Sequence, residues 1–307
     1  MQLTMRPYRA EDDGRVREFL REVFLRNARR ELSWPVYRWD YWRWHGTENI
    51  WRVRLEDVVS LWETPDGRIA AVQNAEDPGE VFLHVDPALG TPELEEEMIA
   101  VAERRLAVPA KEGGRRLRIW AHEREEGRRG ILERRGYVRG RMPEFQRHRT
   151  LDAPIPDAPV AEGYVVRELG GEGELPARSW ASWKAFHPDA PEEGYEGWEW
   201  YRNVQRAPLY RRDLDLVAVA PDGAIASFAT VWFDEASRMG AFEPVGTAKA
   251  HRRRGLAKAV LCEGLRRLRR LGATTAHVGS YEPSAHALYA SVGFTEHEIS
   301  QPWAKSL

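Results

Sequence analysis

Four basic residues stand close together in the last third of the chain, directly before a glycine that opens a helical pattern. The basic residues are Lys249, Arg252, Arg253 and Arg254. Gly255 follows them, and leucines at helical spacing continue the pattern until Gly272. The first turn of a helix presents N–H groups without helix partners and a partial positive charge, for which phosphate is a natural ligand. The spacing is neither G-x-G-x-x-G nor G-K-[ST]. It predicts a phosphate or pyrophosphate site of another kind.

The stretch before this basic turn, residues 241–247, predicts a strand that a proline interrupts. Phe242, Val245 and Thr247 suit a partly buried strand. Proline cannot donate to a strand ladder, so we expect a bulge or a splayed strand near Glu243 and Pro244. Such a bulge would leave backbone groups free to bind a ligand next to the anion site.

Two motifs in this region resemble those of one enzyme family. Arg252-x-x-Gly255-x-Ala257 resembles the pyrophosphate-binding motif R/Q-x-x-G-x-G/A of the GNAT acetyltransferase superfamily, which holds the pyrophosphate of acetyl-coenzyme A. Alone, this pattern also fits an ordinary helix start with solvated arginines. Residues 282–294, EPSAHALYASVGF, resemble the family's closing helix and strand, N-P-x-A-x-x-L-Y-x-x-x-G-F. Pro283 suits a first helical turn and Gly293 the left-handed residue after the last. The two motifs in order favour the family.

The resemblance implies acetyl-coenzyme A as the cofactor and assigns roles to particular residues. Glu243 is the candidate general base and Tyr289 the candidate general acid for the leaving thiolate. A glutamate facing solvent and a tyrosine packed in the core are the alternatives. The candidate cofactor-binding residues are Val245, Gly246, Thr247, Arg252, Arg253, Arg254, Gly255, Leu256, Ala257 and Lys258.

The chain departs from the family pattern before the closing helix. Glu282 stands where the family usually has asparagine, which puts any contact of that amide with the cofactor in doubt. His277 could point into the cleft, but a packing role is the alternative. Cys262 is expected to be core rather than an acylated nucleophile. His187, Pro188, Glu192 and Glu193 lie where the family builds its acceptor pocket, and acidic residues beside tryptophans would suit a cationic amine; a solvated loop is the alternative.

Composition sets the outer bounds. A length of 307 residues favours two domains, and 46 basic against 48 acidic side chains give no overall field that would attract nucleic acid. One cysteine excludes an internal disulfide framework and a cysteine-rich metal site. We find no run of 18 apolar residues and no signal-peptide pattern, so we expect a cytoplasmic protein without membrane or nucleic-acid partners and without a metal. The 13 tryptophans are unusual and could line a pocket or an interface.

The chain reads as two copies of one pattern. Asp66 and Asp222 are 156 positions apart (222 − 66), and Gly136 and Gly293 are 157 apart (293 − 136). We therefore predict an α/β (α+β, mixed-sheet) fold of two tandem GNAT domains: residues 1–150, a proline-containing linker at 151–163, and a catalytic domain at 164–307. The first copy has Pro92 and several glutamates at the corresponding helix start, so it should be a degenerate domain. This asymmetry resembles tandem proteins of the mycothiol synthase type.

Two classes of function remain open. One is an N-acetyltransferase that acts on a primary amine of a small molecule by direct transfer in a ternary complex. The other is a non-catalytic module that binds acetyl-coenzyme A as a sensor or keeps only the fold. Peptide synthesis from aminoacyl-transfer RNA would need a basic groove that the charge balance does not favour. The acceptor is not identified by the residues, and a monomer and a homodimer are both expected possibilities.

Overall fold

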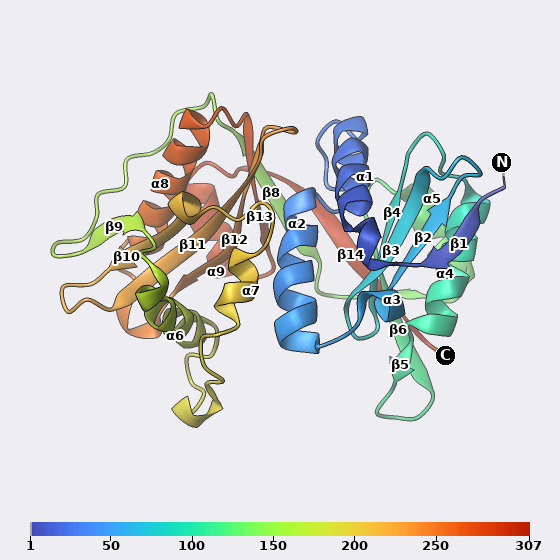
Figure 1. The fold of residues 1–307 in the computed structure, drawn as a ribbon, viewed down its shortest axis with the longest axis horizontal. Coiled ribbons are helices and arrows are strands. Elements are labelled where there is room, and N and C mark those ends of the chain that lie inside the picture. Colours follow the sequence, from blue (N-terminus) through green and yellow to red (C-terminus); the bar gives the residue numbers. More distant parts are fainter. Residues whose placement is uncertain (1) are drawn as a thin grey trace. The chain divides into compact units, whose positions relative to one another are not determined.

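The computed structural model describes residues 2–307 and divides into two compact units (Figure 1). The N-terminal unit consists of residues 2–145 together with Glu298–Leu307, and the C-terminal unit of Gln146–His297. Each unit contains a run of neighbouring strands with helices on both faces. No helix within residues 2–307 combines the length and the apolar character needed to cross a membrane.

The N-terminal unit is built on a mixed sheet in the order β1-β2-β3-β4-β6-β14. The strands from β1 to β4 are antiparallel to their neighbours, β4 pairs in parallel with β6, and β14 is antiparallel to β6. Its strands are β1 (Thr4–Pro7), β2 (Val59–Glu63), β3 (Ile69–Asp77), β4 (Glu80–Val85), β5 (Val108–Pro109), β6 (Arg115–His122), β7 (Val138–Arg139) and most of β14 (Glu296–Ser306). Its α-helices are α1 (Asp13–Arg26), α2 (Val36–Tyr41), α3 (Leu55–Val58), α4 (Pro92–Arg105) and α5 (Glu126–Arg134).

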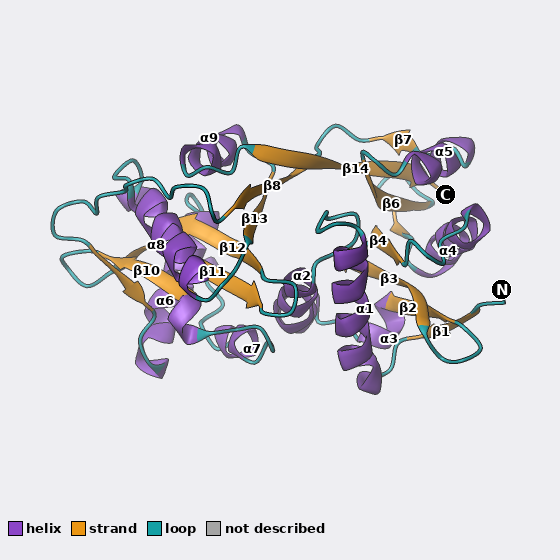
Figure 2. Ribbon diagram, turned by 90° about the horizontal axis from the view of Figure 1, so that it is seen from above, coloured by secondary structure: helices purple, strands orange, loops and turns teal. Residues whose placement is uncertain are grey.

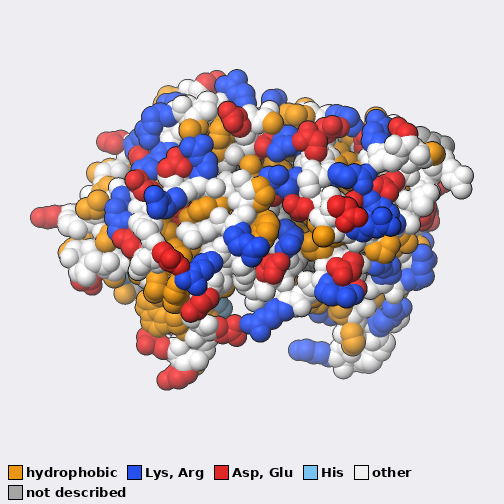
Figure 3. Space-filling model, in the orientation of Figure 1, with side chains coloured by type: hydrophobic (Ala, Val, Ile, Leu, Met, Phe, Trp, Pro, Cys, Tyr) orange, Lys and Arg blue, Asp and Glu red, His pale blue; other side chains and the backbone are white. Residues whose placement is uncertain are grey.

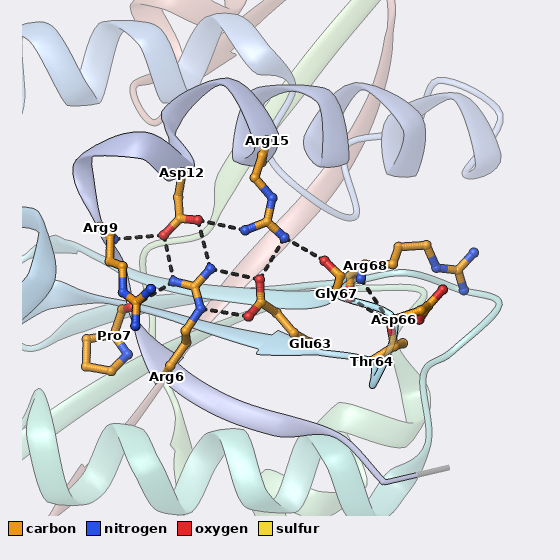
Figure 4. Close-up of polar contacts among 10 residues, drawn as sticks. All are labelled: Arg6, Pro7, Arg9, Asp12, Arg15, Glu63, Thr64, Asp66, Gly67 and Arg68. Atoms are coloured by element: carbon orange, nitrogen blue, oxygen red, sulfur yellow. Dashed lines mark hydrogen bonds and ion pairs between the residues drawn. The ribbon is translucent and has the colours of Figure 1, made fainter.

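Two separate apolar clusters cover the two faces of this sheet. Residues of α4 and α5 pack on one face, and residues of α1 and α2 pack on the other (Figure 2). The start of α1 is joined to the sheet by an ion-pair network. The Arg6 guanidinium lies 2.7 Å from both the buried Asp12 and Glu63, and Arg15 also pairs with both carboxylates (Figure 4).

The C-terminal unit contains mixed strands in the order β9-β10-β11-β12-β13-β8. Its neighbours from β9 to β12 are antiparallel, whereas β12 and β13 are parallel. Its strands are β8 (Glu144–Thr150, largely in this unit), β9 (Val165–Glu168), β10 (Asp215–Val219), β11 (Ile225–Asp234), β12 (Met239–Thr247) and β13 (Thr275–Ser280). Its α-helices are α6 (Leu175–Phe186), α7 (Tyr201–Gln205), α8 (Leu256–Arg270) and α9 (Pro283–Ser291).

The predicted leucine stripe forms the core between α8 and its sheet. Leu261, Leu265 and Leu268 are fully buried against residues of β11 and β12. A side chain at Gly264 would place its Cβ 2.5 Å from Phe242 Cε1, so glycine allows the helix to approach β12 closely. This packing positions the start of α8 at the end of β12.

The compact units differ from the predicted boundaries in two places. The last strand, β14, pairs with β6 and belongs mostly to the N-terminal unit, where Trp303 is buried in the core. The predicted linker at 151–163 lies within the C-terminal unit. Leu151 is buried in its core, and Arg269 donates to the Leu151 and Ala153 carbonyls. Local composition indicated a tether, but these nonlocal contacts hold the segment on the unit.

Many of the tryptophans form core. Trp39, Trp62 and Trp232 have no exposed surface. These three residues therefore belong to the core and do not line an interface. Basic and acidic side chains are interspersed over the face drawn in Figure 3, in line with their near-equal numbers.

Candidate active site

The strand β12 contains the bulge that Pro244 predicted. Ala229 of β11 pairs with Val245, and Val231 pairs with Phe242, so two steps along β11 match three along β12. The extra residue falls at Glu243 and Pro244.

The two parallel strands also separate beyond this point. The pairing between β12 and β13 ends at Ala241 and His277, although β12 continues to Thr247 and β13 to Ser280. The edge of β12 after Ala241 is therefore outside the ladder with β13. β13 therefore does not use the backbone groups on this edge.

Side chains from β11 and α6 hold the bulged strand in place. Trp232 Nε1 donates a 2.6 Å hydrogen bond to the Glu243 carbonyl. A Cβ at Gly246 would lie 2.3 Å from Phe228 Cζ and 3.0 Å from Ala185 Cβ, so only glycine fits there without movement. Sequence analysis did not identify Trp232, Phe228 or Ala185 as part of the site. The sequence indicated them indirectly through Gly246, because a glycine within a strand often marks a place where another group approaches the backbone closely.

The loop after β12 delivers free N–H groups at the start of α8. Arg253 and Gly255 both have positive φ, of 64° and 75°, and Gly255 is the N-cap without a side-chain cap. The first helical bond runs from the Ala259 N–H to the Gly255 carbonyl. The N–H groups of the preceding first-turn residues have no partner within the helix. Those residues are Leu256, Ala257 and Lys258.

The three arginines of this loop are exposed, but they are not equivalent. Arg252 donates from Nε to the Thr247 carbonyl and from Nη2 to the Ala185 carbonyl. This side chain therefore holds the loop against α6, and its contact with a cofactor stays a prediction. Arg253 and Arg254 add positive charge beside the helix start.

Glu243 and Tyr289 lie in the same region. Tyr289 is buried on α9, with 7% of its surface exposed. Burial raises the pKa of Tyr289 to about 12, and the negative charge of Glu243 adds to this rise. The phenol is therefore protonated at neutral pH, as a proton donor must be. Glu243 is partly exposed at the bulge, where a substrate could reach it.

The other residues considered from sequence have ordinary surroundings. Burial raises the pKa of the Cys262 thiol, which disfavours the thiolate that acylation would need. His277 is buried and stacks on His148 with ring centroids 5.6 Å apart. Glu282 is exposed at the N-cap of α9, where its side chain makes no cap hydrogen bond.

The acidic segment proposed to meet an amine is already paired with lysines. Glu192 lies 2.7 Å from Lys184 Nζ, and Asp189 pairs with Lys249. His187 stacks on Trp183 at 4.0 Å. These contacts favour the solvated-loop alternative for this segment.

Comparison with known proteins places one segment of the chain in a family. Residues 177–294, which contain β12, α8 and Tyr289, match the Acetyltransferase (GNAT) family. This segment is a GNAT acetyltransferase domain. The recognition made from the two motifs is confirmed, and with it the prediction that the chain carries an acyltransferase domain.

Two relatives of this chain are mycothiol acetyltransferases. The one from Kineococcus radiotolerans is 30% identical in an alignment of 197 residues that covers 62% of this chain and 62% of the relative. The one from Streptomyces coelicolor is 30% identical in an alignment of 203 residues that covers 60% of each. The matches thus span about three-fifths of the length of these relatives.

Two solved structures share the fold along nearly the whole chain. A GCN5-related N-acetyltransferase from Sphaerobacter thermophilus has a TM-score of 0.66 at 17% identity, over 99% of this chain and 95% of the other. A tandem GNAT protein from the clavulanic acid biosynthesis pathway has a TM-score of 0.66 at 14% identity, over 99% and 98%. At these identities the likeness shows the fold alone. The predicted fold class is confirmed.

Proposed function

We propose that this protein transfers the acetyl group of acetyl-coenzyme A to a primary amine of a small molecule, directly in a ternary complex. The observation that carries the proposal is the uncapped start of α8 at the end of a bulged strand, within a GNAT domain. The mycothiol acetyltransferase relatives support a small-molecule acceptor. The identity of that acceptor is not part of the proposal.

The residues at this site fit the proposed cofactor. The N–H groups of Leu256, Ala257 and Lys258 would hold the pyrophosphate, with positive charge from Arg253 and Arg254. The free edge of β12 would hold the pantetheine arm through backbone groups. This edge of β12 is formed by Val245, Gly246 and Thr247.

Two side chains would manage protons in this reaction. Acetyl-coenzyme A supplies an activated thioester when it is bound. Glu243 would accept a proton from the amine, and Tyr289 would protonate the departing thiolate. The raised pKa of Cys262 supports direct transfer over an acyl-cysteine route.

In this proposal the C-terminal unit is catalytic and the N-terminal unit is a degenerate GNAT domain that supports it. The alternative is a non-catalytic sensor with the same fold. The two are distinguished by turnover, since both would bind the cofactor.

Calorimetric titration with acetyl-coenzyme A tests the binding step. We expect one site, lost in Gly255→Val because valine disfavours φ of 75° and would disturb the helix start. Gly272→Val is the matched control, since Gly272 has φ of 87° just beyond the other end of α8. Two sites would overturn the degenerate-domain assignment, and no binding to the wild type would overturn the acetyltransferase proposal.

A further inference from the structure

A pocket in the C-terminal unit lies on the α6 side of the loop that leads to α8. It has a volume of about 420 Å³ and is lined by residues of α6, the start of β11 and the loop after β12. The residues that matter here are Trp180, Lys184, Pro188, Ile225, Lys249 and His251. Neither the catalytic pair nor the free edge of β12 contributes to it.

The walls of this pocket are apolar and one of them is a rigid ring. Trp180, Pro188 and Ile225 present hydrocarbon or aromatic surface, and alanines complete the lining. The indole of Trp180 is held edge-to-face against Tyr195, with centroids 5.0 Å apart. An aromatic wall of this kind suits a flat apolar group.

The polar side chains at the pocket are two lysines and a histidine. Lys184 Nζ lies 4.9 Å from the Trp180 ring centroid, and Lys249 and His251 come from the adjoining loop. His251 Nδ1 is bonded to the Tyr164 hydroxyl at 3.0 Å. No carboxylate is among the residues that line the pocket.

Both lysines are balanced only by carboxylates that face water. Lys184 pairs with Glu192, whose side chain is 66% exposed, and Lys249 pairs with Asp189, which is 79% exposed. Exposed pairs of this kind contribute little, because water and salt screen them. An anion inside the partly enclosed pocket can therefore replace them.

We propose that this pocket binds a flat apolar group that carries a negative charge, with Lys184 and Lys249 as the cations that recognise it. Two molecules could supply such a group. One is the 3′-phosphorylated adenosine end of coenzyme A, a source that rests on the proposed function, because Lys249 precedes the α8 anion site by only a few residues. The other is an acidic aromatic part of the acceptor.

The first experiment titrates the protein with 1-naphthoate and with 1-naphthylmethylamine, which differ in the sign of their charge. We expect the carboxylate to bind about tenfold more tightly than the amine, as one charge-assisted contact implies. Lys184→Ala and Lys249→Ala should each weaken naphthoate binding severalfold, while Lys111→Ala, an exposed lysine of the N-terminal unit, should not. Absence of naphthoate binding, equal affinity for the amine, or indifference to both lysine variants would overturn the proposal.

The second experiment identifies the source with coenzyme A and dephospho-coenzyme A, which lacks the 3′-phosphate. If the pocket holds the cofactor end, coenzyme A binds more tightly than dephospho-coenzyme A, Lys249→Ala removes the difference, and coenzyme A displaces naphthoate. If naphthoate binds unchanged in saturating coenzyme A, the pocket serves the acceptor. Failure of coenzyme A to bind the wild type would count against the proposed function, whereas the naphthoate titration would still decide the nature of the pocket.

Discussion

The helices α4 and α8 follow corresponding strands of the two units, yet they treat their first N–H groups differently. In α4 the Thr91 side chain accepts from the Leu94 N–H, and Pro92 has no N–H to offer. The loop before α4 also satisfies one of its own N–H groups, since the Asp86 side chain accepts a hydrogen bond from the Ala88 N–H. In α8 the N-cap is Gly255, which has no side chain to satisfy a donor. The start of α4 therefore has a side-chain cap, whereas the start of α8 has none.

The strands before these helices show the same contrast. Val72 and Phe228 each lie five residues after the turn glycine of their hairpin, Gly67 or Gly223. Val72 pairs with His84 of β4, and Phe228 pairs with Gly246 of β12.

His84 stands at the position that corresponds to Gly246, where the Phe228 ring and Ala185 leave no room for a side chain. Its ring nitrogens are bonded to Asn74 and to the Trp34 N–H, at 2.8 Å and 3.2 Å. Burial holds the pKa of His84 well below its usual range, so the ring is a neutral part of the core. At this strand position the N-terminal unit therefore has a buried histidine, and the C-terminal unit has a glycine packed against an aromatic ring.

We expect the largest effect on turnover from a substitution of Glu243, the residue at the bulge. Glu243 has no counterpart in β4, where pairing runs unbroken from Ala71 to Ala75. We expect Glu243→Gln to lower kcat by about 10²–10⁴-fold with cofactor affinity unchanged, because general-base catalysis contributes that much. Glu235→Gln, at an exposed turn of the same unit, is the control. Steady-state rates with an accepted amine measure the effect, and unchanged turnover would remove Glu243 as the base.

A larger residue at Gly246 would be overpacked against Phe228 and should impair cofactor binding. In Gly246→Ala the added Cβ would meet the Phe228 ring at 2.3 Å, so β12 or the ring must move. Overpacking of this kind costs about 1–3 kcal/mol, and if the strand moves we expect a loss of cofactor affinity of about tenfold or more.

A second substitution separates overpacking from other causes. Phe228→Leu in the Gly246→Ala background removes the clashing ring atoms and should recover part of the affinity and of the melting temperature. Calorimetry and thermal unfolding of the two variants give both quantities. Full wild-type affinity in the single variant would show that the free edge of β12 is not used.

At high pH, Tyr289 should make a contribution to stability that its counterpart in the N-terminal unit cannot make. Its counterpart at the 157-residue offset is Leu132, which has no proton to lose. The pKa of Tyr289 in the folded protein is about 12, above its value of about 10 in the unfolded chain. The unfolded state therefore loses the proton first, and this residue's contribution to stability is lost as pH rises from about 10 to about 12.

The Tyr289→Phe variant measures this contribution directly. Between pH 8 and pH 11 the loss of unfolding free energy should be smaller in the variant by about 1 kcal/mol, since pH 11 lies about one unit above the unfolded pKa and one pKa unit corresponds to about 1.4 kcal/mol. Urea titrations of both proteins at pH 8 and pH 11 provide the comparison. Equal alkaline losses would mean that the phenol is not shielded by the core.

Sequence patterns predicted the parts of this site that depend on local chemistry. Pro244 indicated the bulge, Gly255 and the leucine stripe indicated α8, and the turn glycines located both hairpins. These features follow from backbone restrictions of single residues, which can be read without knowing their partners.

The unpredicted parts depend on partners far along the chain. The pairing of β14 with β6 follows from the burial of Trp303 among residues that lie more than 150 positions earlier. The charge of Arg252 suggested ligand binding, but its side chain donates hydrogen bonds to the Thr247 and Ala185 carbonyls. A charge pattern indicates where an anion could bind, but it does not show which donors the fold itself uses.

The cap of α4 should give the smallest effect, confined to stability. Thr91→Ala removes the acceptor of the Leu94 N–H and should lower the free energy of unfolding by about 1 kcal/mol, as loss of a threonine cap does. Thr91→Ser keeps the acceptor and should stay near the wild type. Acetyl-coenzyme A affinity should be the same in all three proteins if the helix start of α4 serves only the helix. A changed affinity in Thr91→Ala alone would mean that the N-terminal unit takes part in binding after all.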